Sequence, residues 1–309
     1  MKKITLTIGI PAYNEEKNII NMLKSVVKQR QESFILEKII VISDGSSDKT
    51  EKRVRDFSKK YPIIKLKADR RRLGKAERLN QLYRLNESDF LGTFDADIVL
   101  ERDFELELMM QIIVNKKEVN VVAANQLSAL SKTWMGKFST ASFYMFYEAA
   151  KKYRDGNNIH CLQGSASIIR KKFAKSLNIP EDTSVDQGFL YVSATQKNRK
   201  GFSFAHNTRI IFNPISSFKD WRILGLRTLA SDKQNLGKLF GRKILSEYNM
   251  PKKLIYESIL KCFFRNPFET AGAIIMNFYI RKFPLVTNKA FKSTGIWEIV
   301  SSSKEAIRI

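Results

Sequence analysis

The chain has 309 residues, of which 43% are hydrophobic and 11% aromatic, so it can bury a sizeable core and is not intrinsically disordered. The length predicts about two domains, or one domain with an appendage. The net charge of +23, from 54 basic and 31 acidic residues, predicts an anionic partner such as nucleic acid, a membrane surface or a phosphorylated substrate. Cys161 and Cys262 lack the spacing of a disulfide framework or a zinc site, which favours a reducing compartment.

The first half of the chain alternates between apolar runs and segments with helical periodicity. We interpret the N-terminal "MKKITLTIGI" as a first strand, at Leu6–Ile10 and ended by Pro11, because its apolar part is too short for a signal peptide and no cleavage site follows. Further strands are expected at 38–43, 63–68, 89–97 and 119–125, with helices at 14–29, 47–60, 74–85 and 103–116. This alternation predicts βαβ units, a mainly parallel sheet and an α/β fold.

Polar clusters follow the first four predicted strands. They read "PAYNEE", "SDGSSD", "DRRRLGK" and "DAD" in chain order. Because parallel sheets bind ligands at the carboxyl ends of their strands, these clusters are expected to meet at one edge. Turn chemistry alone does not account for four of them.

Asp95 and Asp97 end a buried strand with one residue between them. Burying carboxylates is costly unless a cation or hydrogen-bond donors compensate for the charge. The sharper interpretation is a bound cation, and the alternative is a turn or a helix cap.

The second half begins with an aromatic, helix-rich segment at 134–154. A strand and a helix start follow in "CLQGSASIIRKKFA", and an acidic loop and another helix lie at 177–201. Basic amphipathic helices are expected around Asp220–Ile244, Pro251–Arg265 and Pro267–Arg281. Residues 215–309 hold 17 basic and 7 acidic side chains, a net of +10. The longest apolar run there, Ala271–Ile280, is too short to span a bilayer, which needs about 20 residues.

In this order, the motifs "PAYNEE", "VISDGSSDKT", "GKAERLN", "FDAD" and "EDTSVDQ" resemble a family 2 inverting glycosyltransferase of the GT-A fold. The resemblance covers about residues 4–215. It implies a catalytic domain at 1–215, a Rossmann-like, mainly parallel sheet flanked by helices, and a basic helical region at 216–309. It also implies a nucleotide-diphospho-sugar donor and Mg²⁺ or Mn²⁺ as cofactor.

The resemblance also implies roles for residues on the donor side. One or both of Asp95 and Asp97 would hold the metal, which would bridge the diphosphate, and Asp44 would bind the base or ribose. Lys75, at a helix start, would lie near the diphosphate, to which one of Arg70, Arg71 and Arg72 could add a contact. The "PAYNEE" residues Pro11, Tyr13 and Glu15, together with Asp95, would lie beside the nucleotide. The alternatives are a strand-end turn for Asp44 and a favourable first-turn charge for Glu15.

Inversion needs a general base on the acceptor side. The candidates are Glu181, Asp182 and Asp186. The common family text favours Asp182, whereas a variant that places the acid at the helix start favours Asp186, which we prefer. The resemblance places Gln163, Gly164 and Ser165 on the acceptor side, with a tight strand connection as the alternative.

One basic residue of the 216–309 region, Arg227, could contact the diphosphate. The chain has Trp221 before Arg222 and no Gln-x-x-Arg-Trp motif, which argues against processive polymer synthesis.

These features predict a cytoplasmic, peripheral transferase, with a UDP-sugar as donor and a glycan or lipid-linked glycan as acceptor. The basic C-terminal helices would either pack against the catalytic domain or contact a membrane surface. No nucleic acid is expected, because no DNA or RNA module is present. The alternatives are a polyprenyl-phosphate sugar transferase of the same fold and a non-catalytic module that binds anionic lipid or nucleic acid.

Overall fold

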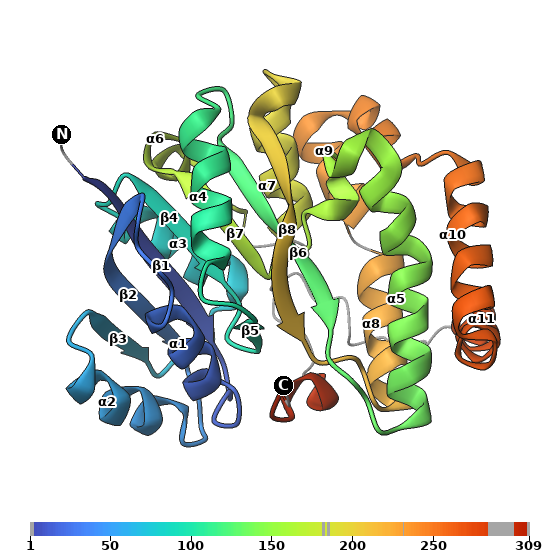
Figure 1. Ribbon diagram of the computed structural model, residues 1–309, viewed down its shortest axis with the longest axis horizontal. Coiled ribbons are helices and arrows are strands. Elements are labelled where there is room, and N and C mark those ends of the chain that lie inside the picture. Colours follow the sequence, from blue (N-terminus) through green and yellow to red (C-terminus); the bar gives the residue numbers. More distant parts are fainter. Residues whose placement is uncertain (1–2, 181–182, 184–185, 231, 284–299, 308–309) are drawn as a thin grey trace.

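A computed structural model of the chain describes residues 3–180, 183, 186–230, 232–283 and 300–307 (Figure 1). The side chains of residues 226–235 lie outside this description. Within it, eight strands form a sheet in the order β3-β2-β1-β4-β7-β6-β8-β5. Their bounds are β1 Ile4–Ala12, β2 Phe34–Asp44, β3 Ile64–Asp69, β4 Phe90–Phe94, β5 Ile98–Leu100, β6 Val121–Ser128, β7 Ala166–Arg170 and β8 Phe202–Phe212.

The sheet has a parallel part and a mixed part. Strands β3, β2, β1 and β4 are parallel, as are β6 and β8. Strand β7 runs antiparallel to its neighbours β4 and β6, and β5 runs antiparallel to β8. The predicted α/β fold with a mainly parallel sheet is confirmed, and β7 is the strand expected in "CLQGSASIIRKKFA".

The two faces of the sheet carry separate apolar cores, because successive residues of a strand point to opposite faces. In β2, Ile39 and Val41 join one core, whereas Ile40 and Ile42 join the other. The first core is covered by α1 Ile19–Val27, α2 Thr50–Lys60 and α4 Glu105–Asn115. The second is covered by α3 Lys75–Leu85, α5 Trp134–Lys152, α6 Lys171–Ser176 and α7 Asp186–Thr195. Burial of each such side chain contributes about 1.5–3 kcal/mol relative to exposure, so the sheet is a rigid base for its loops.

Helices follow β8, namely α8 Phe218–Ala230, α9 Asp232–Phe240, α10 Lys252–Arg265 and α11 Pro267–Lys282. The last two of these pack on the long helix α5. The Ser258 hydroxyl of α10 donates to the Tyr144 carbonyl at 3.4 Å, and the Asn277 amide of α11 donates to the Ser142 hydroxyl at 2.8 Å. In Figure 1, α10 and α11 form the outer layer beside α5. No helix of the described residues is both long enough and apolar enough to cross a membrane.

The last described segment, Val300–Ile307, returns to the sheet and is drawn in red in Figure 1. It includes a short 3₁₀ turn at Ser301–Lys304. Asn18, just before α1, donates through its side-chain amide to the Lys304 carbonyl at 3.2 Å and accepts from the Ile307 N–H at 3.1 Å. This segment therefore lies against the loop between β1 and α1.

Two expectations for the N-terminal loop are wrong. Strand β1 does not end at Pro11 but runs to Ala12, with Pro11 opposite Ile42. Pairing of β1 with β4 stops at Gly9, so the missing N–H of Pro11 costs no hydrogen bond on that side. Helix α1 begins at Ile19 with no acidic residue in its first turn, so Glu15 precedes the helix.

The helix expected at Asp220–Ile244 is also divided. Helix α8 ends at Ala230, α9 ends at Phe240, and a 3₁₀ segment covers Arg242–Tyr248. Gly241, with a positive φ of 85°, separates the last two, because a left-handed residue ends a helix.

Candidate active site

Lys75 joins three of the predicted site residues. It is the first residue of α3, directly after Gly74, whose φ is 89°. Its ammonium Nζ lies 2.7 Å from Asp95 Oδ1 and 3.5 Å from Asp186 Oδ2. It also donates to the Gly164 carbonyl at 3.2 Å. The residues that follow β4, precede β7 and begin α7 therefore meet at the carboxyl end of the parallel strands.

Asp95 is the first residue after β4. Its N–H donates to the Ser165 carbonyl at 2.8 Å, which ties the "FDAD" turn to the loop before β7. The Ser165 hydroxyl in turn contacts the Gln126 side-chain amide of β6. Neighbouring Gln163 turns back, and its amide donates to the His160 carbonyl. Of the three predicted acceptor-side residues, Gly164 and Ser165 thus touch the acidic cluster, whereas Gln163 bonds within its own loop.

Asp186 begins α7, as the alignment with an acid at the helix start predicted, and Phe189 and Leu190 are the first core residues of that helix. Gly164 lies against it with φ +74°, and a Cβ there would stand 3.5 Å from Asp186 Oδ2 and 2.9 Å from Gln187 Oε1. The positive φ favours glycine here, and a Cβ would crowd the Gln187 side chain while making only ordinary contact with the carboxylate. The other candidate bases, Glu181 and Asp182, lie outside the described residues.

The charges in this cluster influence one another. Burial raises the pKa of the Asp186 carboxyl, which Lys75 opposes. Burial likewise raises the pKa of Asp97, with Lys304 opposing and Asp95 adding to the rise. For Lys75, burial alone would lower the ammonium pKa, but Asp186 and Asp95 outweigh it and raise the pKa. Lys75 is therefore held charged between the carboxylates.

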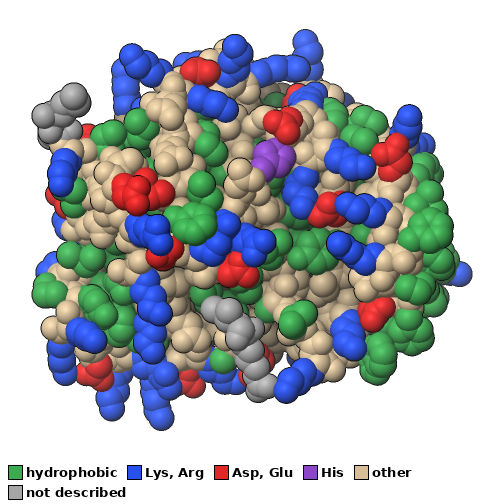
Figure 2. All heavy atoms as spheres, in the orientation of Figure 1, with side chains coloured by type: hydrophobic (Ala, Val, Ile, Leu, Met, Phe, Trp, Pro, Cys, Tyr) green, Lys and Arg blue, Asp and Glu red, His purple; other side chains and the backbone are tan. Residues whose placement is uncertain are grey.

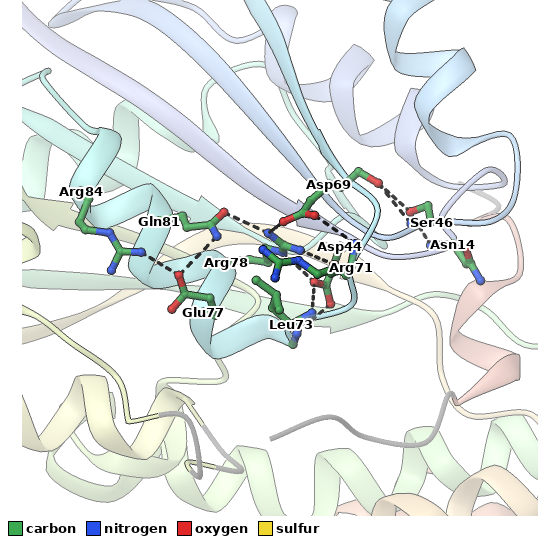
Figure 3. A network of polar contacts seen from close by, with 12 residues as sticks. Asn14, Asp44, Ser46, Asp69, Arg71, Leu73, Glu77, Arg78, Gln81 and Arg84 are labelled. Atoms are coloured by element: carbon green, nitrogen blue, oxygen red, sulfur yellow. Dashed lines mark hydrogen bonds and ion pairs between the residues drawn. The ribbon is translucent and has the colours of Figure 1, made fainter. Parts of the chain in front are cut away.

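Asp44 is buried, and its carboxylate is bound from within the protein (Figure 3). It accepts from the N–H groups of Leu73 and Gly74 at 2.8 and 3.0 Å, and from Arg78 Nε at 2.7 Å. Arg78 is 1% exposed and also contacts Asp69 at 3.0 Å. Asp44 therefore fixes the "RRRLGK" loop that presents Lys75.

Arg78 is a residue that the sequence interpretation missed. It lies one turn after Lys75 in α3, where it resembles an ordinary charged helix position. The signal that could have found it is the pair Asp44 and Asp69, two acids at neighbouring strand ends that need a buried cation.

The first two loops are joined by polar contacts. Asn14 has φ 51°, its N–H donates to the Ser46 hydroxyl at 3.1 Å, and its side chain accepts from the Ser47 N–H at 2.8 Å. The Tyr13 ring packs under the Arg72 guanidinium, with the guanidinium carbon 4.1 Å from the ring centre. Tyr13 and Pro11 thus lie on the loop side of the sheet where the nucleotide was predicted.

Glu15 is a buried carboxylate at the same edge. Its N–H donates to the Thr50 hydroxyl at 2.7 Å, and its side chain is 4% exposed. Burial and the neighbouring Asp97 raise the pKa of Glu15 to about 8, which the Lys304 ammonium opposes. Lys304 forms an ion pair with Glu15. No local sequence pattern predicted this contact, because the two residues are 289 positions apart.

The carboxylates of Asp95 and Asp97 suit a hard divalent cation, but they are too few to complete its coordination. Carboxylate oxygens are suitable ligands, and Mg²⁺ commonly uses one or two carboxylates together with substrate phosphates and water. The described residues contain no group of three or more acidic, histidine or cysteine side chains that could hold a metal. A cation at the aspartate pair would therefore need further oxygens from water or from a substrate.

Arg227 lies in α8, but its side chain is outside the description, so the predicted diphosphate contact stays a prediction. The proposed boundary near residue 215 also stays a prediction.

Relatives share part of this chain. It is similar to the probable glycosyltransferase YdaM of Bacillus subtilis, with 29% identity over 184 residues, which cover 58% of this chain and 44% of that protein. Its identity to the poly-beta-1,6-N-acetyl-D-glucosamine synthase of Staphylococcus epidermidis is 25% over 185 residues, which cover 57% of this chain and 43% of that protein. The chain thus matches less than half the length of these two relatives.

Solved structures have the same fold at low identity. The mannosyltransferase PcManGT of Pyrobaculum calidifontis, in complex with GDP-Man and Mn²⁺, aligns with a TM-score of 0.56 and 18% identity over 91% of this chain and 76% of that chain. The glucosyl-3-phosphoglycerate synthase of Mycobacterium tuberculosis, in complex with Mn²⁺, UDP and glucosyl-3-phosphoglycerate, aligns with a TM-score of 0.51 and 14% identity. The alignment covers 76% of this chain and 80% of that chain. The fold is therefore GT-A.

The sequence profile of glycosyl transferase family 2 matches residues 7–177. That range is more than half of the chain and contains Asp44, Lys75, Asp95 and Gly164, the residues that the structure gathers around the carboxyl ends of the parallel strands. The chain belongs to glycosyl transferase family 2.

Proposed function

We propose that this protein is an inverting glycosyltransferase that moves a sugar from a nucleotide-diphospho-sugar to a hydroxyl group of a glycan or lipid-linked glycan. The observation that carries the proposal is the Lys75 ammonium, which lies 2.7 Å from Asp95 and 3.5 Å from Asp186. A predicted donor-side acid and a predicted acceptor-side acid therefore lie within reach of one side chain.

The reaction assigns a task to each group. The acceptor oxygen attacks the anomeric carbon, and the bond from that carbon to the diphosphate breaks on the opposite face, so the leaving nucleotide takes the electron pair. The Asp186 carboxylate accepts the acceptor's proton, for which its burial and raised pKa suit it. Lys75 stabilises the diphosphate and orients Asp186. Asp95 and Asp97 would hold Mg²⁺ or Mn²⁺, which supplies charge neutralisation to the diphosphate.

We propose a UDP-sugar as donor. Among GT-A neighbours, the Mycobacterium tuberculosis synthase was solved with UDP and Mn²⁺, whereas the Pyrobaculum calidifontis enzyme was solved with GDP-Man and Mn²⁺. Because these two neighbours bind different nucleotides, the titration described below decides which nucleobase the donor carries. Tyr13 and Asp44 would lie beside the base and ribose, with Asp44 acting mainly through the loop that it fixes.

The second candidate is a polyprenyl-phosphate sugar transferase, whose acceptor is a phosphate. A Trichomonas vaginalis protein named dolichyl-phosphate beta-glucosyltransferase ALG5C is 29% identical to this chain over 160 residues, which cover 48% of each protein. A phosphate acceptor needs little help from a base. Asp186 is a candidate general base at the site, and its presence favours a hydroxyl acceptor.

Calorimetric titration with UDP, GDP, dTDP and CDP, each with Mn²⁺ and with EDTA, tests the donor class. We expect one diphosphate to bind, more tightly with Mn²⁺, and the metal-dependent gain to disappear in Asp97→Ala. Binding of none of the four under either condition overturns the transferase proposal and leaves a non-catalytic binding module.

We further propose that the outer face of α10 and α11 contacts an anionic membrane surface. It exposes large apolar side chains, namely Tyr256, Leu260, Phe263, Phe264, Phe268, Ile274, Ile275, Phe278 and Tyr279. Lys252, Lys253, Lys261, Arg265, Arg281 and Lys282 are exposed on the same helices. Figure 2 shows apolar side chains gathered at the edge where Figure 1 places α10 and α11. Aromatic side chains are well suited to the headgroup zone of a bilayer. The basic side chains would attract anionic lipid, so the combination of the two favours an anionic membrane as the partner.

Sedimentation with lipid vesicles tests this contact. Vesicles that contain anionic phosphatidylglycerol should bind the protein, and binding should weaken as salt rises. Equal binding to purely zwitterionic vesicles, or none to either kind, contradicts the proposal. A peripheral location follows from this proposal, whereas the cytoplasmic location stays a separate prediction.

A further inference from the structure

The segment Val300–Ile307 is anchored beside the candidate active site by contacts that do not involve the Lys304 ammonium. Ser302 donates through its N–H to Asp220 at 2.7 Å, and the Asn213 side-chain amide donates to the Glu305 carbonyl. Asn18, which is buried, holds both the Lys304 carbonyl and the Ile307 N–H. Main-chain groups therefore set the position of this segment, and the Lys304 side chain projects from a fixed base.

That side chain ends among carboxylates. The Lys304 ammonium pairs with Glu15, and the charges of Asp97 and Asp95 also act on it. Lys304 is 27% exposed and Glu15 4% exposed, in contrast to the neighbouring pair of Lys17 and Glu305, which is 51% and 63% exposed. An exposed pair such as the latter contributes little, whereas a charge in a partly buried cluster is screened far less.

Glu15 also has a free acceptor in this cluster. Its Oε1 pairs with Lys304, but Oε2 is buried and has no hydrogen-bond partner among the described residues. A buried, unsatisfied carboxylate oxygen is costly, so the site favours a further donor or cation at this point. A donor or cation that binds Glu15 Oε2 would face the same acidic cluster as the Lys304 ammonium.

We infer that Lys304 is a donor-site residue, whose ammonium group is a built-in cation that contacts the nucleotide diphosphate and competes with a divalent metal for the carboxylates of Asp95 and Asp97, next to Glu15. The inference rests on the proposed function for the identity of the anion, but not for the competition with metal. The Lys304 ammonium would then partly substitute for the metal, and the segment Val300–Ile307 would be part of the active site.

The inference predicts effects of opposite sign in Lys304→Ala. Removal of the competing charge should tighten binding of Mn²⁺ to the nucleotide-free protein by roughly tenfold, since unit charges a few ångströms apart near a surface interact by several kcal/mol before screening. Binding of the diphosphate in EDTA should weaken by roughly tenfold, because the site keeps Lys75 but loses the charge of Lys304.

The measurements are calorimetric titrations with Mn²⁺ alone, and with UDP, or the diphosphate that the wild type binds, in EDTA. Lys304→Arg should restore both affinities, since it keeps the charge. Lys17→Ala is the matched control: it removes one positive charge and one contact to the same segment, and both affinities should stay within twofold of wild type. Thermal unfolding of each variant reports whether the fold survives.

A purely structural role for Lys304 would weaken Mn²⁺ and diphosphate binding together, and that result overturns the inference. Unchanged Mn²⁺ affinity in Lys304→Ala also overturns it. A wild-type protein that binds Mn²⁺ but no nucleoside diphosphate contradicts the proposed function instead, and the Mn²⁺ comparison between wild type and Lys304→Ala still decides whether Lys304 occupies the cation position.

Discussion

The sheet with its loops and the C-terminal part of the chain contribute to the site in different ways. At the sheet edge, charged groups are buried or half-buried and share partners: Arg78 joins Asp44 and Asp69, and Lys75 joins Asp95 and Asp186. The C-terminal helices instead pack on α5 through one face and expose large apolar side chains on the other. The first region therefore holds chemistry in a fixed geometry, and the second offers surface.

This difference indicates where single substitutions should have large effects on stability. Removal of one member of a buried charge network leaves its partner uncompensated, which costs several kcal/mol. An exposed side chain can be replaced within about 0.5 kcal/mol of stability. Lys304 is the exception that joins the regions, because it comes from the C-terminal part but lies in the buried network.

The largest expected effect is in Asp186→Asn. The amide cannot accept the proton of the acceptor, so kcat should fall by about 10²–10⁴-fold, equivalent to about 3–5 kcal/mol of barrier. Donor affinity should change little, because Asp186 is assigned to the acceptor's proton. Rates of nucleotide release, measured with the donor that calorimetry identifies, test this expectation. Asp182→Asn is the control, and a loss of kcat in Asp182→Asn with a normal rate in Asp186→Asn would transfer the role of base to Asp182.

Next in size is the destabilisation expected in Arg78→Ala. It leaves Asp44 buried without its cation and frees the loop at Leu73, so the free energy of unfolding should fall by about 3–5 kcal/mol. Arg84→Ala in the same helix is the matched control, since Arg84 is 59% exposed and pairs with Glu77 at the surface. It should cost less than about 1 kcal/mol. Urea denaturation of both variants checks the difference, and equal costs would show that the buried network adds nothing.

The sequence predicted the parallel part of the sheet and the residues at its strand ends. Lys75 and Asp95 could be placed because a strand or helix boundary stands beside each in the chain, and parallel strands bring such boundaries together. The pairing of β7 between β4 and β6 could not be placed, since it depends on contacts about 75 residues apart, such as Thr93 with Ser167. Nor could Lys304, because nothing local marks a lysine that a distant segment will bury.

A smaller effect is expected from Gly164→Ala. The left-handed φ of +74° would strain alanine, and its Cβ would press on Gln187 and approach Asp186. The free energy of unfolding should fall by about 1–3 kcal/mol, and kcat should fall because the crowded Gln187, which follows Asp186 in α7, must move. Gly241→Ala has a similar φ of +85°, but its Cβ would meet nothing within 4 Å. It should therefore lose some stability and no activity. If both variants kept full activity, the contact between Gly164 and Asp186 would have no catalytic role.

The smallest effect on stability is expected on the outer face of α11. Substitutions there test directly whether the C-terminal helices offer a surface, in contrast to the fixed charge networks at the sheet edge. Ile275 and Phe278 are 67% and 65% exposed, so the double variant Ile275→Ser, Phe278→Ser should unfold within about 1 kcal/mol of wild type. Its partition onto anionic vesicles should nevertheless fall by tenfold or more, because insertion of each large apolar side chain contributes about 1.5–3 kcal/mol. Leu85→Ser, at the end of α3 and 38% exposed, is the control and should bind vesicles like wild type. A double variant that bound vesicles normally would leave the basic side chains as the whole attraction, whereas one that unfolded readily would show that this face is part of the core. Retained stability with lost vesicle binding would mean that the C-terminal helices supply a surface and not a second core.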